Sequence, residues 1–82
     1  MSVVEQEQLL SRITTNPDII VGKPTVRGMR ITVEQIVNAV AAGVTTAELL
    51  EDYPELEEPD IRACLFYAAR SVSAERVYRI AE

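Results

Sequence analysis

The chain has 82 residues, a mass of 9.1 kDa and a formal net charge of −5, and its only aromatic residues are three tyrosines and one phenylalanine. A chain of this size forms one small domain that buries only about 60% of the surface of its unfolded form, so we expect a homodimer or higher oligomer. One cysteine and no histidine exclude an internal disulfide and the commonest metal and acid–base sites, and we predict no enzyme activity, no metal and no cofactor.

The N-terminal residues 1–11 are predicted to form an arm or a short helix. They lack a basic start followed by an apolar segment, and no apolar run in the chain approaches the roughly 20 residues of a membrane span. We therefore expect a cytoplasmic protein without membrane attachment. The main domain is predicted over residues 12–72, with a β element over 12–32, a three-helix bundle over 33–72 and a C-terminal helical tail over 73–82.

The β element is predicted from two patterns. Arg12–Thr15 has the composition of a short strand, and Asn16–Asp18, which contains Pro17, is a turn signal that ends it. Two further β-type runs, Thr25–Arg27 and Arg30–Thr32, flank the pair Gly28–Met29. Glycine at the first central position suits a two-residue II′ turn, because that position needs a positive φ, and the pattern predicts a hairpin here.

The first helix of the bundle is predicted to begin after Thr32. The spacing of Thr32 and Gln35 is that of a capping box, and Gly43 supplies a left-handed helix stop. Between these signals lies one apolar stripe with helical spacing, formed by Val33, Ile36, Val37, Val40 and Ala41.

Two more helices are predicted to follow. A second capping box, Thr45–Glu48, opens a short helix that Pro54 ends, and Pro59 suits the first turn of a third helix. This third helix is expected to show a break near Ser71–Ser73 before the tail. Its predicted core stripe consists of Ile61, Cys64, Leu65, Ala68 and Val72. On this stripe Cys64 is expected to be a small buried hydrophobic residue.

The charge is unevenly distributed along the chain. Seven of the thirteen acidic residues lie between Glu48 and Asp60, with no lysine or arginine among them. Such a band favours a basic partner protein, whereas binding of nucleic acid would have to use local basic patches. Neighbouring carboxylates such as Glu51 and Asp52 lie on solvated turns, so they make weak candidates for a catalytic or metal pair.

The segment from residue 45 to residue 70 has the order of elements of a helix-turn-helix, which is a short capped helix, a turn and a longer helix. On the third helix Arg62, Phe66 and Arg70 are spaced at i, i+4 and i+8, which predicts an exposed stripe able to contact phosphate and base edges. The acidic residues at the start of this helix would repel phosphate. The alternative is that Phe66 lies in a dimer or partner interface flanked by solvated arginines.

Three more basic residues, Lys23, Arg27 and Arg30, lie on or beside the predicted hairpin. One interpretation makes them a wing that contacts the phosphate backbone of DNA. The other pairs Arg27 and Arg30 with the protein's own acidic band.

An ordered series of short motifs resembles the domain-of-unknown-function family 433 (DUF433). Two residues depart from the family's usual hairpin, since Met29 and Thr32 stand where threonine and proline are common. The resemblance covers roughly residues 12–70, and its motifs are Ile13–Ile19, Gly22–Val33, Ala42–Gly43, Leu50–Leu56, Asp60–Ala63 and Tyr67–Ala69.

This resemblance implies a mainly α, homeodomain-like, helix-turn-helix fold preceded by a small β-hairpin. It also implies an antitoxin of a type II toxin–antitoxin system, which neutralises a PIN-like nuclease toxin and represses its own operon. The tail would hold the toxin through Val77, Tyr78 and Ile80, together with the acidic band. Operator DNA would be bound by Lys23, Arg27, Arg30, Arg62, Phe66 and Arg70. The alternative is a protein-interaction module or a structural homo-oligomer that does not bind DNA.

Overall fold

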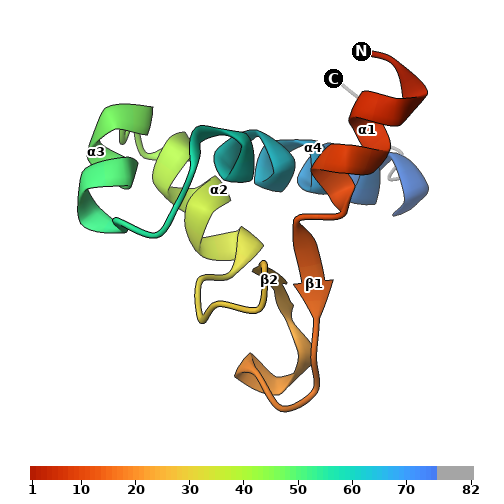
Figure 1. Cartoon of the computed structure of the whole chain (residues 1–82), viewed down its shortest axis with the longest axis horizontal. Helices are drawn as coiled ribbons and strands as arrows, with labels where there is room; N and C mark the ends of the chain where they lie inside the picture. The colour runs from red at the N-terminus through yellow and green to blue at the C-terminus, as the bar shows by residue number, and fades with distance from the viewer. Residues whose placement is uncertain (76–82) are drawn as a thin grey trace, which may run out of the picture.

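The computed structural model describes residues 1–75, and in this part of the chain four α-helices lie to one side of a small two-stranded antiparallel sheet (Figure 1). The long helix α4 runs along one side of the molecule, with α3 near one end and α1 near the other, while the strands extend away from it. The elements in chain order are α1 (Val3–Leu10), β1 (Ile13–Thr15), the 3-10 helix η1 (Ile20–Gly22), β2 (Pro24–Val26), α2 (Val33–Ala41), α3 (Thr46–Asp52) and α4 (Glu58–Glu75). None of these helices is long and apolar enough to cross a membrane.

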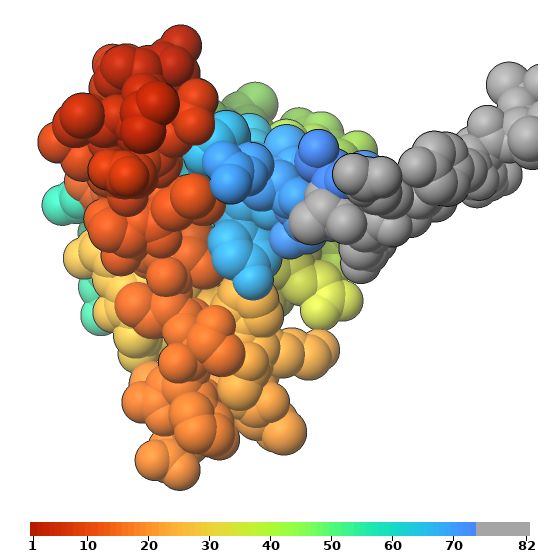
Figure 2. Space-filling model, turned by 90° about the vertical axis from the view of Figure 1, so that its right-hand side faces the viewer, coloured from red at the N-terminus to blue at the C-terminus, as the bar shows by residue number. Residues whose placement is uncertain are grey.

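The prediction of a three-helix bundle is wrong, because residues 3–10, within the segment expected to form an arm or a short helix, form a fourth helix that packs against α4. The Ser2 hydroxyl accepts the Glu5 N–H at 3.1 Å, and Glu5 Oε1 accepts the Ser2 N–H at 2.8 Å, so this helix begins with a capping box. Leu9 buries its side chain. The Ser-x-x-Glu spacing at residues 2–5 was the sequence signal for this helix. Figure 2 shows α1 and the loop before β2 projecting at opposite ends of one face.

The predicted hairpin is also corrected. The sheet pairs β1 with β2, with Ile13 opposite Val26. Of the predicted pairing there remain the bridge between Thr25 and Thr32 and the hydrogen bond from the Val26 N–H to the Ile31 carbonyl, at 2.9 Å. Arg27 and Gly28 both have positive φ, 46° and 75°, which is the pattern of a type I′ turn with Gly28 in the second central position. The Met29 N–H donates to the carbonyl of Val26 at 2.8 Å and closes this turn. The I′ turn matches the right-handed twist of the paired strands.

The start signals predicted for α2 and α3 are confirmed. In α2 the Thr32 hydroxyl accepts the Gln35 N–H at 3.0 Å and the Gln35 side chain accepts the Thr32 N–H at 2.8 Å. In α3 the same pair of bonds joins Thr45 and Glu48, at 3.1 and 2.8 Å. Gly43 has φ 94° after the end of α2, as its left-handed role requires.

The core lies between β2 and the helices α2, α3 and α4, but the core stripe predicted for α4 is partly wrong. Leu65 is 39% exposed and Val72 is 62% exposed, whereas Ala63 is completely buried. Because α1 also packs on α4, the buried arc of α4 extends to Ala63 on its other flank. The helix also continues through the predicted break, since it runs to Glu75. The buried cluster comprises Val26, Ile31, Val33, Ile36, Leu49, Leu56, Ile61 and Cys64.

Candidate functional site

A buried carboxylate holds two of the basic residues near the β element. Asp60 is fully buried in the first turn of α4, and Arg27 Nε and Nη2 donate to its Oδ1 and Oδ2 at 3.0 and 2.8 Å. Arg12 Nη1 donates to Oδ1 at 2.9 Å, and the Glu57 N–H donates to Oδ2 at 2.9 Å. Arg27 Nη2 also donates to the carbonyl of Glu55 at 2.9 Å. Arg27 therefore connects the tight turn to α4. This structural role explains why an arginine stands here without any contact to a nucleic acid.

The hydrogen bonds around Asp60 determine its titration. Burial alone would raise the pKa of Asp60, but hydrogen bonds from Arg27, from the Glu57 N–H and from Arg12 outweigh burial and hold the pKa below its usual range. The carboxylate is therefore charged in the folded protein, and its charge is matched by two guanidinium groups.

This arrangement predicts a loss of stability in acid. A group with a lowered folded pKa contributes its full stabilisation above its unfolded pKa, about 3.9 for aspartate, and loses it as the pH falls through the lower, folded value. We expect the urea concentration at the unfolding midpoint to decrease as the pH is lowered through this range. In the Asp60→Asn variant the midpoint should decrease less over the same range. If both proteins lost stability equally over that range, Asp60 would not be the responsible group.

Two further predicted DNA contacts are paired on the surface. Lys23 Nζ lies 3.3 Å from Glu34 Oε1, and Arg62 Nε lies 3.2 Å from Glu58 Oε1. Both pairs are exposed and contribute little to stability, but each neutralises the cation that was expected to meet phosphate.

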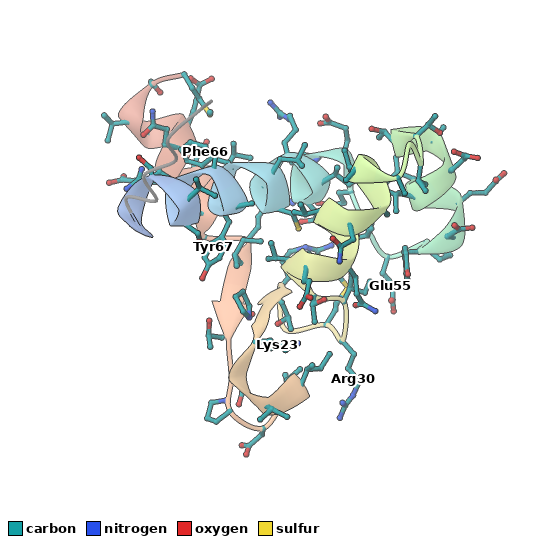
Figure 3. All side chains as sticks on the ribbon, turned by 180° about the vertical axis from the view of Figure 1, so that it is seen from behind. Lys23, Arg30, Glu55, Phe66 and Tyr67 are labelled. Atoms are coloured by element: carbon teal, nitrogen blue, oxygen red, sulfur yellow. The ribbon has the colours of Figure 1, made fainter. Side chains whose placement is uncertain are left out.

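The remaining predicted site residues lie apart from one another. Arg30 is exposed, has no ion pair among the side chains that the structure describes, and points away from the body of the molecule (Figure 3). The Arg70 guanidinium lies over the Phe66 ring, 5.8 Å from its centroid, and Phe66 is half-buried on the side of α4 nearest α1. The structure therefore does not unite the six predicted residues in one basic patch. The predicted partner-binding residues Val77, Tyr78 and Ile80 lie outside the described residues.

Cys64 is buried, as the sequence predicted. Burial, with a smaller contribution from the charge of Asp60, raises the pKa of its thiol to about 12. The residue is a packing group of the core.

The acidic band forms one end of the molecule, around α3 and the start of α4 (Figure 1). Glu48 caps its own helix, whereas Glu57 and Glu58 lie in ion pairs. The side chains of Glu51, Asp52 and Glu55 are exposed and have no ion pair within residues 1–75. These three carboxylates are thus available to a positively charged partner.

A second surface feature is an apolar groove of about 390 Å³ between the N-terminal part of α2 and the C-terminal half of α4. Tyr67 points from α4 toward the part of the molecule that carries Lys23 (Figure 3). Lys23 and Glu34, which pair with each other, lie at the margin. No local sequence signal indicated this groove, because its walls come from segments far apart in the chain. Its apolar lining consists of Pro24, Val33, Val37, Tyr67, Ala68 and Val72.

Comparison with known proteins agrees with the family resemblance. The model of a family described as a protein of unknown function (DUF433) matches residues 13–68. The uncharacterized protein y4eO of Sinorhizobium fredii (strain NBRC 101917 / NGR234) is 41% identical over 56 residues, which are 68% of this chain and 25% of that protein, so this chain spans about a quarter of that relative's length. A crystal structure of a DUF433 member from Anabaena variabilis ATCC 29413 superposes with a TM-score of 0.71 and 25% identity, over 90% of this chain and 80% of the other.

Proposed function

This chain belongs to the DUF433 family, and on that premise we propose that it is a non-enzymatic protein-interaction module of the antitoxin kind, which neutralises a basic partner protein. A nuclease of the PIN type, which binds a polyanion and so presents positive charge, has the chemistry to be that partner. The module would contact it through the exposed carboxylates at the end of α3.

The observation that carries this proposal is the position of Glu51 and Asp52. Both lie in the last turn of α3, where the negative end of the helix dipole makes a carboxylate unfavourable. No arginine or lysine among the described residues compensates them. Charges that do not stabilise their own helix support a role in contact with another molecule.

Binding of operator DNA, the other half of an antitoxin's role, has less support. Arg27, Lys23 and Arg62 each pair with a carboxylate of the chain, and the net charge of −5 opposes approach to a polyanion. A gel-shift titration against the protein's own promoter at several salt concentrations measures this activity, because binding through several phosphates weakens steeply with salt.

The direct test co-expresses the chain with the product of the reading frame immediately downstream of its gene. Replacing the free carboxylates, in the double variant Glu51→Gln and Asp52→Asn, is expected to weaken the complex at least about tenfold through lost charge complementarity. The free energy of unfolding of the isolated variant should not fall, because the lost charges opposed the helix dipole. Titration calorimetry and urea denaturation measure the two effects.

The matched control removes the same amount of charge elsewhere, in the double variant Glu7→Gln and Asp18→Asn. Neither side chain is in an ion pair within the described part of the chain, and both are exposed. Equal weakening by both double variants would show that net charge alone matters. A complex with undiminished affinity in the α3 variant would contradict the proposed contact.

A further inference from the structure

We propose that the face formed by α2 and α4 binds a second copy of this chain, giving a two-fold symmetric dimer. In this dimer an exposed apolar ridge on α4 of each copy lies in the groove between α2 and α4 of the other. This inference is independent of the partner protein proposed above.

The ridge consists of Leu65, Ala69 and Val72, which occupy positions i, i+4 and i+7 of α4 and therefore share one side of the helix. Leu65 is 39% exposed, Val72 is 62% exposed, and Ala69 is also exposed. Within the described part of the chain all three side chains thus keep a substantial part of their surface open to solvent. A continuous apolar stripe of this kind on an exposed helix marks an interaction surface.

The groove lies beside this ridge. Val33 and Val37 of α2 form one wall, Ala68 and Tyr67 of α4 form the other, and Val72 belongs to both the groove and the ridge. One surface thus carries a projection next to a hollow of about 390 Å³. A two-fold contact requires such self-complementarity, because each patch meets a copy of itself.

The charge distribution favours a second copy over a basic protein at this face. Within residues 1–75 the only charged residues that line the groove are Lys23 and Glu34, and they pair with each other at 3.3 Å. The free carboxylates lie around α3, near the other end of α4 (Figure 1). Two molecules that each carry a charge of −5 repel one another, and this neutral face lets them meet with the least repulsion.

The size of the core provides a further argument. Within residues 1–75 the buried cluster contains eight hydrophobic residues, with nine partly buried ones packed against it, and a chain of 82 residues gains only marginal stability from a core of this size. Covering the ridge and the groove in a dimer would extend the apolar interior across the two-fold axis.

Sedimentation equilibrium of the full chain tests this proposal. We expect the wild-type protein to approach twice the 9.1 kDa monomer mass as its concentration rises. Val72→Asp places a charge on the ridge and should raise the dimer dissociation constant at least about tenfold. Ala69→Arg, which keeps a good helix former at an exposed position, should have the same effect.

The matched control is Val21→Asp, on the 3-10 helix η1, because Val21 lines neither the groove nor the ridge. Val21 is 93% exposed and has φ 52°, a conformation that aspartate accepts more readily than valine, so this variant should fold and dimerise like the wild type. Circular dichroism verifies the helix content of every variant. The proposal is overturned if the folded wild type stays monomeric up to about 0.1 mM, or if neither ridge variant changes the dissociation constant.

Discussion

Replacing Asp60 by alanine is expected to lower the free energy of unfolding by about 3 kcal/mol or more. The substitution leaves Arg12, Arg27 and the Glu57 N–H without their shared acceptor, and it removes the link between the tight turn and the first turn of α4. The two guanidinium groups are partly exposed and can regain some hydration, which puts the loss at the lower end of the range for a buried ion pair. A domain of this size has a total stability of about 5 kcal/mol, so the variant would keep about 2 kcal/mol or less and unfold at a much lower urea concentration than the wild type.

Urea denaturation followed by circular dichroism, at one fixed protein concentration, measures this loss. The matched control is Glu58→Gln, which removes a carboxylate from the same helical turn. Among the described residues Glu58 pairs only with Arg62, and both side chains are exposed, so its loss should cost no more than about 1 kcal/mol. Similar losses in the two variants would show that Asp60 acts merely as one more acidic residue of the first turn.

Replacing Leu49 by alanine is expected to cost about 2–5 kcal/mol. Leu49 is 2% exposed and is the one buried residue of α3, a helix of seven residues that is too short to be stable without packing. The cavity would therefore free α3 from the core as well as weaken the core itself. Because α3 carries Glu51 and Asp52, binding of the proposed basic partner should weaken together with stability.

Leu50→Ala is the control, since it makes the same substitution at the next position of the same helix. Leu50 is only half-buried, so its truncation should cost about 1–2 kcal/mol. Urea denaturation of both variants separates the two positions. Comparable losses at Leu49 and Leu50 would mean that α3 is not anchored by the single residue that the structure indicates.

Local signals predicted the helices of the main domain well. Thr32 and Thr45 form the predicted capping boxes, and Gly43 adopts the predicted left-handed conformation, because each of these effects involves residues no more than four positions apart. The same kind of signal at Ser2 and Glu5 would have decided between the arm and the short helix that were expected for residues 1–11. The turn at Gly28 was placed one residue out of register, because the structure gives both Arg27 and Gly28 a positive φ, and the residue type of Arg27 did not indicate this.

The sequence alone was sufficient for the family, for the starts of α2 and α3 and for the net negative charge, because these depend on residue types and short spacings. Only the tertiary structure determined which charged side chains pair with one another. Arg12, Arg27 and Asp60 are 15 to 48 positions apart in the chain, and they meet solely because the sheet packs on α4. The tertiary structure likewise decided that Leu65 and Val72 face solvent, because the arc of α4 that is buried depends on where α1 and α2 dock. Interactions that close long loops leave no local periodicity in the chain, so no reading of spacing could have found them.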